Sequence, residues 1–334
     1  MWPFSRKCQS KVRLVGKTVV ITGANIGIGK ESARDLYRRG ARVILACRDI
    51  NKANLAVEDL KKNPPSRPER EQFNGEPGEL IVCKLNLCSL ASVRECAKLL
   101  NDTEPNIHIL INNAGVMMCP FAKTEDGYET HLQTNHLGHF LFTLLLLPKI
   151  MKSTPARIIN VSSLAHSALG GDIHFDDINL EKSYAPIKAY SQSKLANVLF
   201  TKELDRRLKE AKIEGVNVYS LHPGVISTEL GRHLDSAFFP GAQASFKMFS
   251  SIFVKSPETG AQTTLHCATS EQAGKESGLY YRECAVTSSS RKSRNLEIAR
   301  RLWDESVKMV GWTPNDNFME LLTAAARDIA PEKR

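Results

Sequence analysis

Short apolar runs along the chain alternate with longer stretches in which apolar residues recur at helical spacing. The short runs are rich in Val, Ile and Leu, which is typical of parallel strands buried on both faces. They cover residues 18–22, 42–46, 80–85, 107–112, 157–161, 216–221 and 278–281. The helical patterns cover residues 29–39, 52–62, 90–100, 124–151, 188–212, 257–269 and 296–310. This order predicts an α/β fold, a doubly wound parallel sheet of about seven strands (Rossmann-type) with helices on both faces.

Two irregular stretches interrupt this order. Residues 63–78, NPPSRPEREQFNGEPG, are rich in Pro, Gly and charge, which predicts an exposed loop before the third strand. Residues 229–255 follow the sixth strand, and ligands of open α/β sheets bind beyond the carboxyl ends of the strands. Phe246, Phe249 and Phe253 form a helical stripe there. The stripe fits a core-facing helix, and equally an apolar lid that covers a long hydrophobic substrate and touches a membrane surface.

Charge and composition narrow the classes of function. Hydrophobic residues make up 42% of the chain and charged residues 24%, and both are spread as in an ordinary globular protein. The formal net charge of +9 would suit a phosphate-bearing partner. The basic residues are dispersed over separate amphipathic stretches, however, so we expect no nucleic-acid partner. A dinucleotide phosphate or an anionic membrane surface would account for the charge.

Cysteine spacing and the first residues bear on metals and location. The eight cysteines form no CxxC pair and no Cys/His cluster at zinc spacing, so we expect free thiols and no metal site. The segment MWPFSRKCQSKVRLVGK has no apolar run long enough for a signal peptide or a spanning helix. We therefore expect a protein that is cytoplasmic or peripherally attached to an intracellular membrane.

A glycine-rich turn, TGANIGIG at residues 22–29, follows the first strand and precedes an amphipathic helix. Glycine permits positive φ and a close approach of backbone N–H groups to a pyrophosphate, which the helix N-terminus also favours. A nucleotide triphosphatase loop is excluded, because five residues separate Gly23 from Gly29 and Glu31 stands where Ser or Thr is required. The turn predicts a dinucleotide site.

The end of the second strand, VILACRD, indicates which dinucleotide binds. An arginine there suits the 2′-phosphate of NADP, and a carboxylate suits the ribose 2′-hydroxyl of NAD. Arg48 comes first and offers a guanidinium fork, which favours NADP(H). Asp49 follows directly and leaves NAD as an alternative, since a shift of one residue would reverse the assignment.

Four polar residues are candidates for proton transfer. Tyr190 and Lys194 are four residues apart in a helical pattern, so their side chains share one helix face. An ammonium group and an oxidised nicotinamide ring near a phenol would lower the phenol pKa and make it a usable acid/base. Ser163 ends the fifth strand, where its hydroxyl can stabilise charge on a substrate oxygen, and Asn135 lies in the long fourth helix.

The combination of these motifs resembles the short-chain dehydrogenase/reductase family. The match spans residues 15–285. It consists of TGANIGIG, NNAG at 112–115, Asn135, Ser163, YSQSK at 190–194 and HPG at 222–224. Further segments look like the branch that includes retinol dehydrogenases 11 to 14: GANIGIGKE, ACRD, LINNAGVMMCP, ETHLQTNHLGHF, SKLANVLFTKEL, LHPGV and GAQTTLHCA.

The resemblance implies one dinucleotide-binding catalytic domain over residues 1–334, with a core at 15–285 and a helical extension at 291–330. It implies that Tyr190 donates a proton, that Lys194 binds the nicotinamide ribose, and that Ser163 orients the carbonyl. Asn135 would hold a water that relays protons to Lys194. The residues expected to bind NADP(H) are Gly23, Asn25, Ile26, Gly27, Ile28, Gly29, Arg48, Asn86, Leu87, Asn113, Ala114, Gly115, Tyr190, Lys194, Pro223, Gly224 and Thr228.

The sequence departs from that branch at three places. Asn86-Leu87 stands where the branch usually has Asp-Leu, so an adenine contact is altered, although an amide oxygen can still accept a hydrogen bond. Many relatives have an N-terminal membrane helix, whereas residues 1–17 here contain no apolar run of that length, so we expect no such helix in them. The Pro-rich insertion at 63–78 is unusual for the branch.

The expected activity is hydride transfer to or from a small hydrophobic substrate, with retinal/retinol as the leading pair by resemblance. A carbonyl reductase acting on steroid, isoprenoid or lipid aldehydes or ketones is the alternative, and a non-catalytic NADPH-binding sensor is a further one. A homodimer is compatible with the sequence.

Two other classes of site are disfavoured. The sequence gives no support for a serine hydrolase, because it contains no GxSxG motif. His166 lies three residues from Ser163, but closeness in sequence alone does not make a catalytic triad. His131, His136 and His139 share the predicted fourth helix without a matching carboxylate or cysteine, which indicates ordinary histidines rather than metal ligands.

Overall fold

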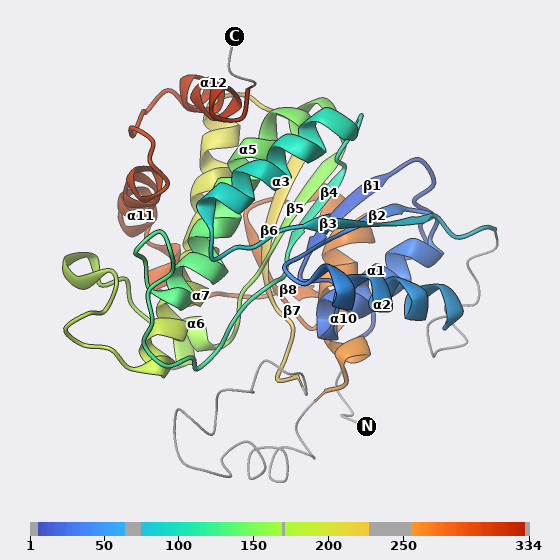
Figure 1. Cartoon of the computed structure of the whole chain (residues 1–334), viewed down its shortest axis with the longest axis horizontal. Coiled ribbons are helices and arrows are strands. Elements are labelled where there is room, and N and C mark those ends of the chain that lie inside the picture. Colours follow the sequence, from blue (N-terminus) through green and yellow to red (C-terminus); the bar gives the residue numbers. More distant parts are fainter. Residues whose placement is uncertain (1–5, 64–74, 169–170, 227–254, 331–334) are drawn as a thin grey trace.

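The structure is a computed structural model that describes residues 6–63, 75–168, 171–226 and 255–330. Its centre is an eight-stranded sheet with the order β3-β2-β1-β4-β5-β6-β7-β8 (Figure 1). The strands are β1 (Thr18–Thr22), β2 (Arg42–Cys47), β3 (Glu79–Lys84), β4 (Ile109–Asn112), β5 (Ala156–Val161), β6 (Val216–His222), β7 (Leu279–Arg282) and β8 (Ala285–Val286). All neighbours are parallel except β7 and β8, which are antiparallel. The predicted doubly wound parallel sheet is therefore confirmed, with the two-residue β8 added.

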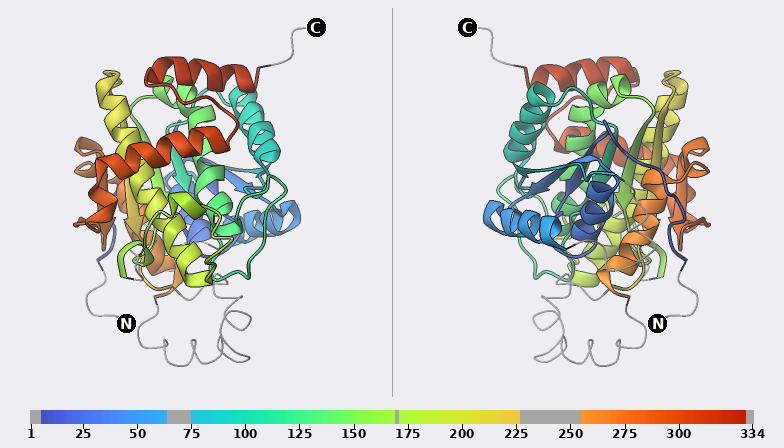
Figure 2. Two further views of the ribbon diagram at one scale, coloured as in Figure 1. Left: turned by 90° about the vertical axis from the view of Figure 1, so that its left-hand side faces the viewer. Right: turned by 90° about the vertical axis from the view of Figure 1, so that its right-hand side faces the viewer.

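Helices cover both faces of the sheet (Figures 1 and 2). One face carries α1 (Gly27–Arg38), α2 (Ile50–Lys62) and α10 (Pro257–Thr269). The other carries α3 (Leu90–Thr103), α5 (Gly138–Lys152) and α7 (Pro186–Glu210). Successive strand residues point alternately into two apolar cores, one on each face of the sheet. Val20 packs against α3 and α5, and Val19 and Ile21 pack against α1 and α10. This two-sided burial explains why the central strands are continuously apolar.

The C-terminal part adds two helices outside α5 and α7, namely α11 (Leu296–Met309) and α12 (Phe318–Asp328) (Figure 2). The Trp303 ring joins them to the core, with its centroid 5.0 Å from that of Phe140 and 6.0 Å from that of Phe318. Shorter helical segments are α6 (Ala165–Ala168) and single turns at Phe175–Asp177, Ala273–Lys275 and Lys292–Arg294.

The predicted helix over 124–151 is wrong at its start. Residues 124–129 form a turn, in which Gly127 has φ +86° and the Thr124 amide donates to the Tyr128 carbonyl. The helical path begins with α4 (Thr130–Leu132), where the Glu129 carboxylate accepts from two amides, as helix N-cap residues do. It continues as a π-helical segment, Gln133–Leu137, and then as α5. Asn135 therefore lies in a π turn, a local irregularity that is frequent at functional sites.

Some sequence-based expectations fall outside the described residues. The phenylalanine stripe at 246–253, Thr228 and residues 64–74 of the Pro-rich insertion belong to this group. Among the helices of the described ranges, none is long and apolar enough to cross a membrane.

Candidate active site

The four candidate proton-transfer residues meet at the carboxyl edge of the sheet. Tyr190 and Lys194 lie in the first turns of α7, where Pro186 starts the helix, and the Lys194 Nζ is 5.8 Å from the centre of the Tyr190 ring. Ser163 follows β5, and its hydroxyl lies near enough to the Tyr190 phenol to lower the phenol pKa. Tyr190 and Lys194 are buried and Ser163 is half-buried, so the three side chains are largely shielded from solvent.

Burial decides the protonation of the pair in this structure. It raises the pKa of the Tyr190 phenol above its ordinary value, and the nearby Ser163 hydroxyl offsets this rise only in part. The expected lowering by the ammonium group is absent here. Burial also lowers the pKa of Lys194 to about 8. At neutral pH the phenol therefore keeps its proton, which suits a proton donor.

Gly115 keeps the space above Lys194 open. A Cβ atom at Gly115 would lie 3.4 Å from the Lys194 Nζ and 3.1 Å from the Asn135 Oδ1. The Lys194 ammonium group donates to the Val161 carbonyl at 3.1 Å, which fixes it at the end of β5. These contacts bring Gly115, Asn135 and Lys194 together around one small volume.

The side chain of Asn135 is hydrogen-bonded to protein atoms through both its oxygen and its nitrogen. Its Oδ1 accepts from the Val116 amide at 2.8 Å, and its Nδ2 donates to the Val116 carbonyl at 3.0 Å and to the Ser193 hydroxyl at 2.9 Å. The main-chain carbonyl of Asn135 accepts from the His139 Nδ1 at 3.0 Å and retains a second lone pair. A water-holding role for Asn135 therefore stays a prediction, and it would fall to this carbonyl.

A network at the end of β1 fixes which nitrogen of His139 carries the proton. The Thr22 hydroxyl accepts from the Asn113 and Ala114 amides, both at 2.9 Å, so its own proton is left for the His139 Nε2 at 2.8 Å. The Nε2 is then an acceptor, and the Nδ1 donates to the Asn135 carbonyl. Burial lowers the pKa of His139 to about 4, which agrees with a neutral ring.

Two further imidazoles hold the main chain around Ser163. The His166 Nδ1 lies 2.6 Å from the Ser163 carbonyl, and its Nε2 accepts from the Ser290 amide at 3.2 Å. The His222 Nδ1 accepts from the Leu164 amide at 3.1 Å. His166 thus contacts the carbonyl of Ser163 rather than its hydroxyl, and the hydroxyl accepts from the Ala165 amide at 3.2 Å.

The predicted phosphate-binding residues form one turn and one helix end. Gly23, Asn25 and Ile26 make the turn, and Gly27, Ile28 and Gly29 begin α1. Gly23 has φ +66°, and a Cβ at Gly29 would lie 2.5 Å from the Asn113 Nδ2 and 2.6 Å from the Gly23 carbonyl oxygen. No side chain caps α1 at Ile26. The first amides of α1 are therefore suited to an anion.

Arg48 and Asp49 differ in their surroundings at the end of β2. Asp49 is the N-cap of α2, and its carboxylate accepts from the Lys52 amide at 3.0 Å. Arg48 is exposed, and its guanidinium has no hydrogen bond or ion pair to the other described residues. The Asp49 carboxylate therefore serves as a helix cap, whereas the Arg48 guanidinium is available to bind a ligand.

The remaining predicted cofactor residues lie along the same edge. Asn86 and Leu87 follow β3, and the Asn86 Oδ1 accepts from the Cys88 amide at 3.2 Å. That oxygen, the expected adenine acceptor, already supports a turn. Pro223 and Gly224 follow β6, and Gly224 has φ +102°.

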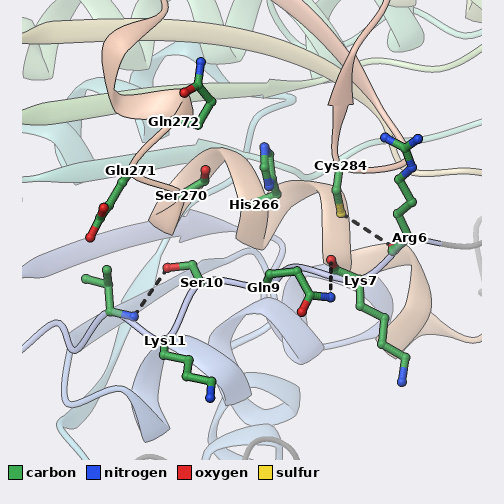
Figure 3. Close-up of a pocket in the computed structure, with 11 residues that line it drawn as sticks. Arg6, Lys7, Gln9, Ser10, Lys11, His266, Ser270, Glu271, Gln272 and Cys284 are labelled. Carbon is green, nitrogen blue, oxygen red and sulfur yellow. Dashed lines mark hydrogen bonds between the residues drawn. The ribbon is translucent and has the colours of Figure 1, made fainter.

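Apolar side chains surround the Tyr190 ring. Met118 and Ala165 are buried against it, and Met117 and Ile187 pack around this group. A separate groove of about 860 Å³ lies between the N-terminal segment and the end of α10, and Figure 3 shows its lining. That lining contains Arg6, Lys11, His266 and Cys284 but none of the predicted site residues.

Sequence reasoning missed the partners of the histidines. His131 has a carboxylate partner, Glu129, with 2.6 Å between the His131 Nδ1 and the Glu129 Oε1, which corrects the expectation that none exists. The spacing in ETHLQTNHLGH could have signalled a buried cluster, but it does not reveal partners such as Thr22, which lies 117 residues from His139.

Comparisons with known proteins agree with this geometry. The family model "short chain dehydrogenase" matches residues 17–174. The chain is 48% identical to retinol dehydrogenase 11 of Homo sapiens over 304 residues, which is 91% of this chain and 89% of that protein. It is 47% identical to retinol dehydrogenase 13 of Homo sapiens over 308 residues, 91% and 87% of the two chains.

A solved structure has the same fold. The crystal structure of an uncharacterized protein from Mycobacterium paratuberculosis has a TM-score of 0.70 at 34% identity and covers 91% of this chain and 97% of its own. The matching motifs, the sheet order and these relatives lead to one conclusion: the chain belongs to the short-chain dehydrogenase family.

Proposed function

We propose that this chain transfers a hydride between NADP(H) and the carbonyl carbon of a hydrophobic substrate, with retinal/retinol as the leading pair. The observation that carries the proposal is the grouping of the Tyr190 phenol, the Ser163 hydroxyl and the buried Lys194 at the carboxyl edge, with the Lys194 Nζ 5.8 Å from the centre of the Tyr190 ring. An acid/base phenol, a hydroxyl at a strand end and a lysine one helical turn away are the groups that such a reaction needs.

The residues present fit a dinucleotide. Side-chain atoms at Gly23 and Gly29 would clash with the neighbouring backbone, and the α1 amides at this cradle have no side-chain cap. NADP(H), when bound, would supply or accept the hydride. The 2′-phosphate would be held by the Arg48 guanidinium. The neighbouring Asp49 carboxylate already caps α2, and its negative charge would repel the phosphate.

In the direction of reduction, Tyr190 donates its proton to the substrate oxygen. The raised pKa of the phenol keeps that proton in place until a substrate oxygen arrives. The Ser163 hydroxyl holds the same oxygen in register, and the Ser163–Leu164 backbone is fixed by His166 and His222. In the direction of oxidation, Tyr190 would accept the alcohol proton in its phenolate form, and the Ser163 hydroxyl would orient the alcohol oxygen.

Lys194 orients the cofactor ribose and exchanges a proton with the surroundings. Its pKa of about 8 permits both charge states near physiological pH. The Asn135 carbonyl, with one lone pair remaining, would hold the relay water that passes protons to this lysine.

The substrate assignment rests on relatives and on the apolar lining. Several curated relatives at 45–48% identity are named retinol dehydrogenases. Met117, Met118, Ala165 and Ile187 give the Tyr190 site an apolar surround that suits a hydrophobic carbonyl compound. Steroid, isoprenoid and lipid aldehydes or ketones share this chemistry and form the second candidate class.

The test uses the purified full chain with NADPH or NADH and a panel of carbonyl substrates. The panel holds all-trans-retinal, a steroid ketone, an isoprenoid aldehyde and a lipid aldehyde, and turnover is read as loss of nicotinamide absorbance. We expect the highest kcat/KM with NADPH and retinal. The Tyr190→Phe variant should bind NADPH normally, while its turnover falls at least about a hundredfold. NADPH binding without turnover of any substrate would instead identify a cofactor sensor.

A further inference from the structure

A buried carboxylate–imidazole pair lies beside the site without reaching it. Glu129 and His131 are both 0% exposed, and 2.6 Å separates the Glu129 Oε1 from the His131 Nδ1. The His131 ring stands edge-on to the Tyr190 ring, with 6.4 Å between the ring centres. Burying a carboxylate costs desolvation free energy unless partners compensate for it. The contacts of this pair show what it does for the structure around it.

The hydrogen bonds of His131 determine which of its ring nitrogens carries the proton. The His131 Nε2 accepts from the Cys119 amide at 3.1 Å, and an amide N–H can only donate. The Nδ1 must therefore carry the ring proton and donate it to Glu129. The carboxylate thus selects the tautomer of His131 that holds Cys119, and it is itself held by the His131 and Leu132 amides at 2.9 and 2.8 Å.

A second side chain holds the other end of the same residue. The Tyr184 hydroxyl donates to the Cys119 carbonyl at 2.5 Å. Tyr184 precedes α7, whereas His131 lies in α4, so two separate elements fix the amide and the carbonyl of Cys119.

Met118, the residue before Cys119, has a strained backbone. Met118 has φ +54°, a left-handed conformation that residues other than glycine adopt when their surroundings impose it. Met118 is buried against Tyr190 and Ala165, with Met117 at the edge of the group. The hydrogen bonds to the Cys119 amide and carbonyl therefore act directly next to this left-handed residue.

We propose that Glu129, His131 and Tyr184 are positioning residues that hold Met117 and Met118 as a fixed apolar wall beside the Tyr190 phenol. The wall limits the width available at the substrate carbonyl carbon, so it favours an aldehyde over a methyl ketone with the same chain. This inference rests on the proposed carbonyl chemistry.

The first test compares kcat/KM for a linear aldehyde and for the methyl ketone of the same chain length. Tyr184→Phe removes only the hydroxyl and leaves the half-buried ring, so the fold should persist. We expect the aldehyde/ketone ratio to fall about tenfold, in line with the cost of misplacing groups near reacting atoms. The NADPH affinity should stay within about twofold. His131→Gln should shift the ratio in the same direction.

Two variants separate the wall from a general loss of structure. Tyr128→Phe is the matched control, because the Tyr128 hydroxyl donates to the Met309 carbonyl at 2.8 Å, outside the clamp. It should leave the ratio unchanged. Met118→Asn retains a residue that tolerates the left-handed region and removes the thioether, so it should shift the ratio as Tyr184→Phe does. An equal loss for both substrates in Tyr184→Phe would overturn the proposal.

An activity-independent measurement keeps this inference apart from the proposed function. Hydrogen exchange of a peptide covering residues 116–121 should be faster in Tyr184→Phe and His131→Gln than in the unmodified protein, and unchanged in Tyr128→Phe. Exchange that is the same in all four proteins would refute the clamp. Absence of turnover with every carbonyl compound, together with the expected exchange pattern, would refute the proposed function and support the clamp.

Discussion

The Thr22 hydroxyl and the His139 Nε2 lie 2.8 Å apart and join the end of the first strand to the π turn that carries Asn135. Thr22 also receives the Asn113 and Ala114 amides, so one hydroxyl links the cofactor cradle to the candidate proton-transfer residues. A change at His139 should therefore affect cofactor binding and turnover together.

Replacing His139 by Phe removes the acceptor for Thr22 and the donor to Asn135. We expect weaker NADPH binding and lower kcat, each by roughly tenfold, and a loss of about 1–3 kcal/mol of unfolding free energy from unsatisfied buried groups. Titration by NADPH fluorescence, steady-state kinetics and urea unfolding measure the three effects. His108→Phe is the matched control, because the His108 Nδ1 accepts from the Thr18 amide at the opposite end of the same strand. A similar fall in activity in the control would count against a specific link.

Acid should unfold the protein through its buried histidines. Burial lowers the pKa of His139 to about 4 and those of His136 and His222 to about 3, from ordinary values of 6.5. Between pH 6.5 and these values the unfolded chain binds protons that the folded chain does not, so stability falls as the pH drops. By pH 4 each group costs on the order of 3 kcal/mol. Urea unfolding at pH 7, 6, 5 and 4 should show this loss, and a flat profile would contradict it.

Lys194 should be a source of instability in the absence of ligand. Its folded pKa of about 8 is below the ordinary 10.5, so the charged form is penalised on folding at neutral pH. Lys194→Met should then raise the unfolding free energy by about 3 kcal/mol at pH 7. From pH 8 to 10.5 the folded chain releases the proton earlier than the unfolded chain, so the advantage of the variant should shrink. Denaturation at pH 7 and pH 10, alongside an activity assay that shows lost turnover, tests the trade-off.

Cofactor preference should follow Arg48 rather than Asp49. We expect Arg48→Ala to weaken NADPH binding by more than about tenfold and to leave NADH binding within about twofold, because only NADPH carries the 2′-phosphate. Asp49→Asn keeps a side-chain oxygen for the α2 cap and should leave the preference unchanged. Equal weakening of both cofactors by Arg48→Ala would show that the arginine acts on something other than the phosphate.

The sequence predicted the sheet well because its strands are buried on both faces. The predicted limits of β1 agree with the structure, because all five of its residues are buried. β8 was not predicted, because two residues are too few to show a strand pattern. The start of the fourth helix was misplaced because Gly127 and the Glu129 cap lie inside an apparently helical pattern. Local turn and cap geometry outweighed periodicity there.

Candidate site residues could be placed because strand ends and one helix face are fixed by periodicity. Their supporting contacts could not be placed in this way. The partners of His139 and His166 come from residues 117 and 124 positions away, and only the folded chain brings them together. The pKa of Tyr190 also depended on burial, a quantity that no local motif reports.

The two edges of the sheet bear on how molecules of this protein behave toward one another at high concentration. β3 carries the exposed charges Glu79 and Lys84 at its two ends, and β8 is only two residues long. Short or charged edge strands give a neighbouring molecule little backbone to pair with, which is how natural sheets resist aggregation. The described architecture therefore favours a protein that stays dispersed when it is concentrated.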